Sequence, residues 1–366
     1  MRLNDLQLPT EVVSIVLGQS LNVGPDNKSE SVLKEARRAL FKLRLVCRSW
    51  NYIAIRHLFE TIQLQYHHKP LQDEDEFGPW SKILGNESFR NTIHRVVINS
   101  TPEDPEMYDS EWSWDEGTGE YPRLTRVIDA IVDLPNLRAV QLSFSDKCFE
   151  PWGSLSGHFD GKGLRFPNLK TLNLISFAIF RYDYLDWVLE QTSLETLRLG
   201  ACCILSHAMV TEEGLAGLKV STKDWIQLPS GAYGTEGPKI AYHFPGTWET
   251  EFDRIRTTLT NLMEFRLSGP DRRSFDGPYD HFDNPENIKN DLANGRYVQF
   301  LSGACSSPCI IPGDGFGDEN PVPTNERGED DEWGECTYHE VMLEGDSRAR
   351  DELLETVKKR RSLKGT

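Results

Sequence analysis

The sequence predicts an α/β protein in which a small helical module at the N-terminus is followed by an irregular solenoid of strand–loop–helix repeats. Three observations predict this architecture. Apolar residues between Val32 and Trp50 recur at three- and four-residue spacing, as on one face of a helix. Further along, short segments repeat an apolar pattern whose last two members alternate, as on a strand. Helical stretches precede several of these segments, so we expect strands on the concave side and helices outside.

The composition is that of a globular chain. The 366 residues are 38% hydrophobic and 27% charged, and their length corresponds to about two domains. The formal net charge is -17, so the chain lacks the excess of basic residues that a protein needs to bind a phosphate backbone. The same charge disfavours binding to an anionic membrane surface. We therefore expect neither nucleic acid nor membrane as a partner.

The N-terminus lacks the features of a secretory signal. Its short apolar run over residues 12–17 is interrupted by Ser14 and preceded by Asp5 and Glu11, with no basic segment before it. Seven cysteines fall far below the count of a disulfide scaffold and indicate reduced thiols. These features predict a cytoplasmic or nuclear protein.

Residues 1–58 form the predicted helical module. A first helix is expected to begin at Leu8-Pro9-Thr10-Glu11, where the missing N–H of proline would be unpaired in any case. The polar segment 22–29 is typical of a loop. A second helix is expected from about Ser31 through Arg48 and beyond.

Parts of this module resemble the F-box. They are Leu8-Pro9-x-Glu11-Val12 and Leu43-Arg44-Leu45-Val46-Cys47-Arg48-Ser49-Trp50. The next segment, Leu58-Phe59-Glu60-Thr61-Ile62-Gln63-Leu64, is similar to the continuation common in fungal F-box proteins. The resemblance implies a set of three helices that binds the Skp-type adaptor of a cullin–RING ubiquitin ligase. It assigns to the adaptor-binding surface Leu8, Pro9, Val12, Leu45, Val46, Cys47 and Trp50.

The spacing of this module departs from that of compact F-boxes, because Pro9 and Trp50 lie 41 positions apart. A longer surface loop costs little free energy, so adaptor docking is compatible with the insertion. The alternative interpretation is a plain helical domain that keeps Val46 and Trp50 in its core.

Residues 59–345 carry the repeats. Four clear copies of L-x-x-L-x-L are Leu137-x-x-Val140-x-Leu142, Leu169-x-x-Leu172-x-Leu174, Leu194-x-x-Leu197-x-Leu199 and Leu262-x-x-Phe265-x-Leu267. Weaker copies are Phe59-x-x-Ile62-x-Leu64, Ile93-x-x-Val96-x-Ile98 and Tyr338-x-x-Val341-x-Leu343. No copy buries its apolar face alone, so neighbours must stack into one core. The irregular spacing resembles the degenerate leucine-rich repeats attached to many fungal F-boxes. The alternative is an unrelated α/β domain.

Helices are expected before the strands, at residues 127–132, 184–189 and 252–255, and residues 287–302 are predicted to form a further helix. Residues 346–366 are predicted to form a C-terminal helix with a basic tail. The cations Lys358-Lys359-Arg360-Arg361 suit the end of a helix dipole, and the alternative is a short nuclear-import signal.

Three stretches fit no repeat and are predicted as insertions, at about 102–121, 201–248 and 313–335. The first is acidic and rich in aromatic residues, and Glu111, Asp115 and Glu116 lie in it. Aromatic rings among carboxylates suit a basic or methylated peptide. The alternative is that the aromatic side chains fold back on the solenoid and the carboxylates are solvated.

The sequence contains no G-x-S-x-G, H-E-x-x-H, Walker or dinucleotide motif. Cys305, Cys309, Cys336 and His339 are zinc-ligand types, but their spacing is wider than in a zinc knuckle, so ordinary thiols are expected. We therefore expect no catalytic, cofactor or metal site, and an enzyme using the Cys and His residues of 305–339 stays the alternative. Arg272-Arg273 is a basic pair that suits a phosphate.

The resemblance implies the substrate-recognition subunit of an SCF-type cullin–RING ubiquitin ligase. Such a protein binds the Skp-type adaptor through the F-box and an unknown target protein through the repeats. It performs no chemistry and acts by holding the target near the ubiquitin-conjugating enzyme. The alternative function is a leucine-rich-repeat interaction scaffold with no link to a ubiquitin ligase.

Overall fold

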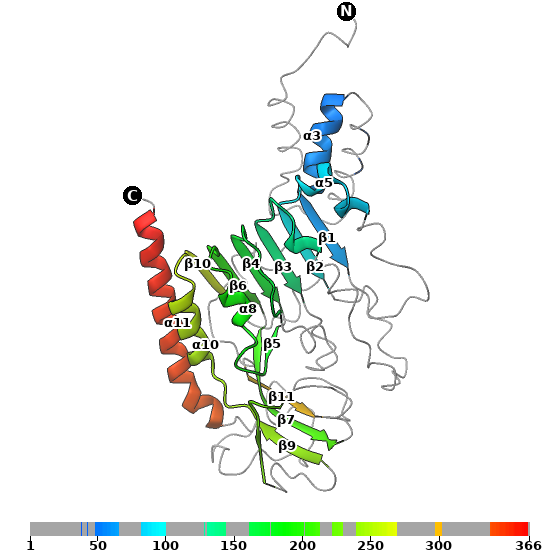
Figure 1. Cartoon of the computed structure of the whole chain (residues 1–366). Coiled ribbons are helices and arrows are strands. Elements are labelled where there is room, and N and C mark those ends of the chain that lie inside the picture. The colour runs from blue at the N-terminus through cyan, green and yellow to red at the C-terminus, as the bar shows by residue number, and fades with distance from the viewer. Residues whose placement is uncertain are drawn as a thin grey trace, which may run out of the picture.

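The structure, a computed structural model, describes residues 38, 42, 48–65, 82–99, 128, 130–143, 161–175, 177–200, 202–212, 222–229, 239–268, 297–301 and 337–364. These residues form a mixed α/β fold whose largest element is a six-stranded parallel sheet (Figure 1). A second sheet, of five strands, lies below the first in the view of Figure 1. Among the described helices, none is long and apolar enough to cross a membrane.

The six-stranded sheet follows the order of the chain. Its strands are β1 (Thr61–Gln65), β2 (Arg95–Asn99), β3 (Ala139–Ser143), β4 (Thr171–Ile175), β6 (Thr196–Gly200) and β10 (Glu264–Ser268). They are hydrogen-bonded in the order β1-β2-β3-β4-β6-β10, and every neighbouring pair is parallel (Figure 1). Six of the predicted L-x-x-L-x-L copies supply these six strands, so their assignment as strands is confirmed.

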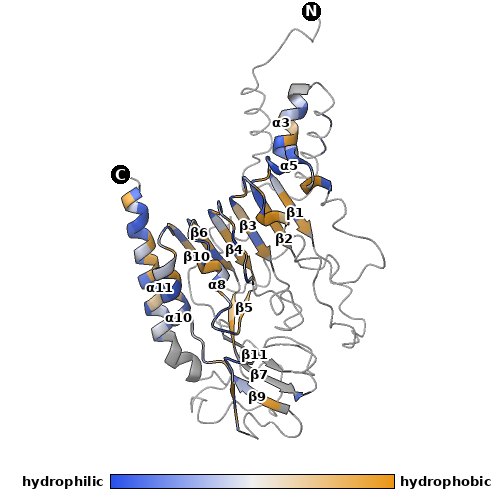
Figure 2. Cartoon of the chain, viewed as in Figure 1, coloured by the Kyte–Doolittle hydropathy of each residue, from blue (hydrophilic) through white to orange (hydrophobic). Residues whose placement is uncertain are grey.

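The copies lie in matching register. Leu172 of β4 pairs with Val140 on one side and with Leu197 on the other, and Leu197 pairs with Phe265. All four side chains are at most 4% exposed. Successive side chains on a strand point to opposite faces, so the apolar residues of the copies, orange in Figure 2, share the face toward the core and the intervening residues lie on the other face. Each buried leucine contributes about 1.5–3 kcal/mol relative to an exposed one.

Neighbouring turns are joined by a repeated side-chain hydrogen bond. The residue before the first leucine of each clear copy donates to a backbone carbonyl of the preceding turn. The donor and acceptor pairs are Asn136 and Asn91 (2.8 Å), Asn168 and Pro135 (3.0 Å), Ser193 and Leu169 (2.8 Å), and Asn261 and Thr192 (2.8 Å). The polar residue that precedes leucine in these copies therefore has a structural role.

Helices precede most of these strands, and those at residues 186–189 and 248–258 bury apolar residues in the same core. They are α3 (Arg48–Phe59), α5 (Glu87–Arg90), α8 (Asp186–Leu189) and α10 (Trp248–Thr258). Residues 128 and 130–132 are also helical, before β3. The three helices predicted at 127–132, 184–189 and 252–255 are thus confirmed, although α8 begins only at Asp186. Thr247 caps α10, because its hydroxyl accepts from the backbone N of Thr250 at 3.2 Å.

The second sheet contains residues that the sequence predicted only as an insertion. Its central strand β7 (Cys203–Thr211) pairs with β5 (Ala178–Ile179), β9 (Lys239–His243) and β11 (Tyr297–Leu301), and β9 also pairs with β8 (Ile226–Gln227). The stretch 201–248 therefore supplies three strands. Its aromatic side chains Phe244 and Trp248 are at most 1% exposed and belong to the core, so here the fold-back alternative is confirmed.

The helix predicted over 287–302 is wrong at its end, because residues 297–301 form strand β11. The segment Tyr297-Val298-Gln299-Phe300-Leu301 is rich in residues that favour strands. Its partner, β7, lies far away in the sequence, so local periodicity did not reveal the pairing.

The last predicted repeat is also wrong. Tyr338-x-x-Val341-x-Leu343 lies in helix α11 (Thr337–Lys364), which begins before the predicted start at 346. A spacing of three residues also occurs on helices, so this weak copy did not discriminate between the two structures. From residue 344 onward the buried side chains recur at three- and four-residue spacing, at Asp346, Ala349, Leu353 and Val357.

Helix α11 binds the N-terminus of α10 through a buried carboxylate. Asp346 is 0% exposed, and its Oδ1 accepts from the backbone N of Glu249 at 2.9 Å. The hydroxyl of Tyr297 donates to both oxygens of Asp346, at 3.2 and 3.0 Å, and accepts from the backbone N of Trp248 at 3.0 Å. A negative charge at this end complements the helix dipole.

The other end of α10 receives a positive charge from the same helix. Arg360 donates to the carbonyl oxygens of Arg256 at 2.9 Å and Leu259 at 2.8 Å. The two helices thus run in parallel, with an acid at the start of α10 and a base at its end (Figure 1). One cation of the predicted basic tail therefore has a structural role.

Replacing Leu197 by alanine tests the core. We expect Leu197→Ala to lower the free energy of unfolding by about 2–5 kcal/mol, because the side chain is 0% exposed and leaves a cavity between neighbouring strands. The same change at Leu363, which is 78% exposed on α11, is expected to cost less than about 0.5 kcal/mol. Urea unfolding measures both variants, and equal losses would contradict the assigned core.

Candidate functional site

Trp50 is the only predicted adaptor-binding residue that falls within the described residues. It lies at the start of α3 and is half-buried. The same helix buries Ile53 and Ala54 and ends at Phe59, one residue before β1. Outside the described residues lie Leu8, Pro9, Val12, Leu45, Val46 and Cys47.

Most other candidates also fall outside the described residues. They are the acidic stretches 102–121 and 313–335, the pair Arg272-Arg273, and Cys305, Cys309 and Cys336. His339 lies in α11, but its side chain is not described. Across the part of the chain that the structure describes, no three His, Cys, Asp or Glu side chains are grouped so as to hold a metal ion.

Cys202 and Cys203 are buried, free thiols. Burial raises the pKa of Cys202 to about 12, and it raises the pKa of Cys203 well above the ordinary value. A nucleophilic cysteine needs a lowered pKa in an accessible position. These two thiols therefore act as packing groups at the junction of β6 and β7.

The face of the six-stranded sheet opposite the core carries a row of mostly polar side chains. It is formed by the middle residue of each strand, and register pairing places these residues side by side about 4.8 Å apart. We call it the polar row, and its members are Gln63, Val97, Gln141, Asn173, Arg198 and Arg266. Sequence reasoning missed these residues individually, although each one is the residue between the last two apolar positions of a copy.

Amide groups connect one half of the polar row. The Oε1 of Gln141 accepts from Nη2 of Arg95 and from Nδ2 of Asn173, each at 3.4 Å. Asn173 is 4% exposed, and its Oδ1 is buried with no hydrogen-bond partner among the described residues. An unmet buried acceptor costs about 1–3 kcal/mol.

A shared carboxylate connects the other half. Glu264 Oε1 lies 3.0 Å from Nε of Arg198 and 2.7 Å from Nε of Arg266. These side chains are 20–32% exposed, so the guanidinium groups remain within reach of a partner. The amides of the polar row on β3 and β4 are at most 5% exposed, so its cations on β6 and β10 are the groups suited to hydrogen-bonded recognition of another chain.

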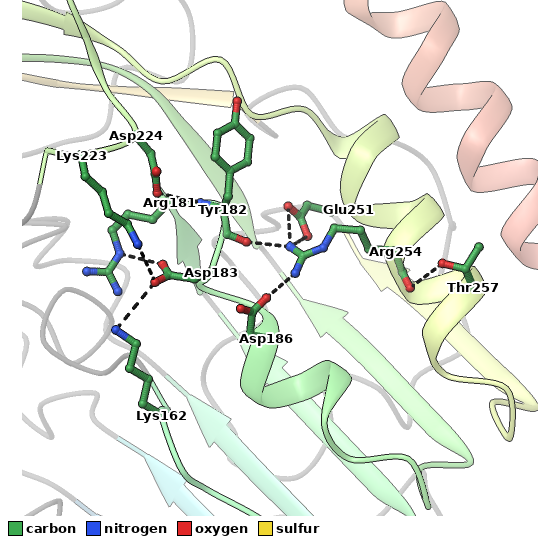
Figure 3. A network of polar contacts seen from close by, with 10 residues as sticks. All are labelled: Lys162, Arg181, Tyr182, Asp183, Asp186, Lys223, Asp224, Glu251, Arg254 and Thr257. Atoms are coloured by element: carbon green, nitrogen blue, oxygen red, sulfur yellow. Dashed lines mark hydrogen bonds and ion pairs between the residues drawn. The ribbon is translucent and has the colours of Figure 1, made fainter.

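Helix α10 carries a second buried carboxylate. Glu251 is 2% exposed, and Nη1 of Arg254 donates to its two oxygens at 3.2 and 3.0 Å. The same guanidinium donates to the carbonyl of Tyr182 at 2.7 Å and pairs with Asp186 (Figure 3). Burial raises the pKa of Glu251 to about 7, although the charge and hydrogen bond of Arg254 lower it. The group braces α10 against α8 and the turn before it.

A carboxyl group that titrates near neutrality suits general acid–base chemistry, but the group must reach a substrate atom. Glu251 is enclosed and both of its oxygens are held by Arg254. Its geometry is therefore that of a structural ion pair, and the polar row is the better candidate for a functional site.

The comparisons with protein families and with curated proteins find no match for this chain. No protein-family model matches the sequence, and no curated protein matches it significantly. The function must therefore be argued from the sequence pattern and from the geometry described above.

The buried carboxyl group makes stability depend on pH. The pKa of Glu251 is about 7 in the folded chain, above its ordinary value of 4.5, so the folded state binds an extra proton between these values. The protonated Glu251 contributes to the free energy of unfolding in full below about pH 4.5. As the pH rises to about 7 this contribution is lost, which lowers the free energy of unfolding by an amount on the order of 2–3 kcal/mol.

The measurement compares wild type with Glu251→Gln, which keeps the shape and cannot titrate. We expect wild type to lose free energy of unfolding relative to the variant between pH 5 and pH 7.5, with no further change above that. A difference that stays constant over this range would contradict the assignment.

Proposed function

We propose that this protein is the substrate-recognition subunit of an SCF-type cullin–RING ubiquitin ligase. Its N-terminal F-box-like module would bind the Skp-type adaptor, and its sheet of leucine-rich-repeat character would bind a target protein. It would act by proximity and perform no chemistry itself. The resemblance implies the cytoplasm or the nucleus as the place of action.

The observation that carries the proposal is the junction between α3 and β1. Trp50, the last residue of the F-box-like motif, lies in the helix that leads into the first strand with only Glu60 between them. The ring of Phe59 also packs on that of Phe89, with centroids 4.6 Å apart. An adaptor bound near Trp50 would therefore be held in a fixed geometry relative to the sheet, as substrate presentation requires.

The polar row supports the second half of the proposal. Its six members lie side by side over six parallel strands, and the register that aligns them is set by the buried leucines beneath. The partly exposed Arg198 and Arg266 are held by Glu264 and so are preorganised, and little ordering cost opposes binding to them.

The test is co-purification of the full chain with a Skp-type adaptor. We expect a stoichiometric complex with wild type, and binding weaker by about 30-fold or more in Pro9→Ala/Trp50→Ala, because buried tryptophan anchors often carry 2 kcal/mol or more. The matched control is Tyr52→Ala, which removes a 68% exposed ring from the same helix and should leave binding unchanged.

Thermal unfolding of each variant separates loss of binding from loss of fold, and Pro9→Ala alone serves where the double variant unfolds. If wild type forms no complex with the adaptor, the F-box reading fails. The interaction scaffold without a ligase then takes its place, because the polar row does not depend on the adaptor.

A further inference from the structure

Three cations converge on one carboxylate near the second sheet (Figure 3). Asp183 Oδ1 lies 3.0 Å from Nε of Arg181, and Oδ2 lies 3.1 Å from Nζ of Lys223 and 3.7 Å from Nζ of Lys162. We call these four residues the cation cluster. Burial alone would raise the pKa of Asp183, but the hydrogen bond of Lys223 and the charges of all three cations lower it below its ordinary value.

Each cation is held in place by its own local structure. Lys162 lies between Gly161 and Gly163, whose φ angles of 61° and 79° favour glycine. A Cβ on Gly161 would also meet the Trp187 ring at 2.3 Å, so this turn is fixed against the core. Arg181 lies 4.9 Å from the ring centroid of Tyr184.

The turn that carries Lys223 is closed by a backbone hydrogen bond from Trp225 to Thr222 at 2.9 Å. The indole Nε1 of Trp225 then donates to the carbonyl of Phe180 at 2.8 Å, next to Arg181 in sequence. The three cations therefore come from three fixed turns, and their convergence does not depend on flexible side chains alone.

The two lysines of the cation cluster are accessible, and its arginine is enclosed. The side chains of Lys162 and Lys223 are 64% and 55% exposed while they contact Asp183. Nη2 of Arg181 is buried and has no acceptor among the described residues. Anions with two or more oxygens suit the two exposed ammonium groups, because charge-assisted hydrogen bonds to such groups are strong.

Apolar surface lies beside the cluster. Tyr182 is 43% exposed and Ile226 is 52% exposed, although both are large hydrophobic residues. The ring of Tyr182 and the ring of Trp225, the residue before Ile226, both pack on Phe244, at 5.1 and 5.9 Å between centroids. Exposed aromatic and apolar residues next to cations are typical of a protein-binding surface.

We propose that the cation cluster, with Tyr182 and Ile226, binds an acidic segment of a partner protein. Lys162 and Lys223 would receive a multi-oxygen anion, either a glutamate or aspartate carboxylate or a phosphoserine phosphate, and the enclosed Arg181 would add its charge from behind Asp183. Tyr182 and Ile226 would receive an adjacent apolar side chain. This inference rests on the proposed function in one respect, namely that the partner protein is the target recruited for ubiquitination.

The test uses fluorescence anisotropy of the full chain with three labelled peptides. The first carries three glutamates flanked by leucines, the second has phosphoserine in place of the central glutamate, and the third has glutamine in place of all three. We expect the two acidic peptides to bind and the glutamine peptide to bind at least 5-fold more weakly. The ratio between the first two distinguishes carboxylate from phosphate as the preferred anion.

Two variants of equal charge change locate the site. Lys162→Gln/Lys223→Gln should weaken acidic-peptide binding by about 3- to 10-fold, as expected for two partly exposed ion pairs. The control is Lys358→Gln/Lys359→Gln, which removes two exposed cations from α11 and should leave binding unchanged. Equal losses in both variants, or equal binding of the acidic and glutamine peptides, would overturn the proposal.

The two proposals fail separately in these experiments. The cation-cluster variant should still co-purify with the adaptor, because Lys162 and Lys223 lie far from Trp50 in the stack of strands. Loss of the adaptor complex in that variant would indicate a general folding defect, which thermal unfolding would reveal, and the single variant Lys223→Gln would then replace it.

Discussion

The parallel register of the six-stranded sheet is the constraint on which the rest of the structure depends. A five-residue strand does not bury its apolar face alone, so each copy is stable only when its leucines lie in line with those of the next. Leu172 meets this condition between Val140 and Leu197. The Asn and Ser bonds between turns select the same register, because a slip of one residue would reverse every side chain.

The same register defines the candidate site. Core positions and polar-row positions alternate along each strand, so aligning Leu172 with Leu197 also aligns Asn173 with Arg198. Arg198 nevertheless turns to Glu264, which is the stronger, charged acceptor, and Oδ1 of Asn173 is left without a partner among the described residues. The candidate site is therefore positioned by the core, because the register that stacks the leucines also aligns the polar row.

The sequence predicted what local patterns determine. The six strands follow from period-two alternation after a turn, and the helices before them follow from three-and-four spacing. The second sheet was missed because β7 pairs with β9 and β11, whose residues lie far along the chain. The segment Tyr338-x-x-Val341-x-Leu343 was assigned wrongly because its spacing also fits a helix, and only the contacts of α11 with α10 distinguish the two.

The two candidate sites also differ in how far the sequence could predict them. The polar row could be predicted from the sequence, because each of its members has a fixed position in its L-x-x-L-x-L copy. The cation cluster could not be predicted in this way. Lys162, Arg181 and Lys223 belong to three turns that the fold alone brings together, in a chain whose net charge is -17. Net charge sets the long-range field, but at ordinary salt that field is screened beyond about 8–10 Å. A positive site of a few ångströms is therefore compatible with an acidic protein, and only the structure reveals it.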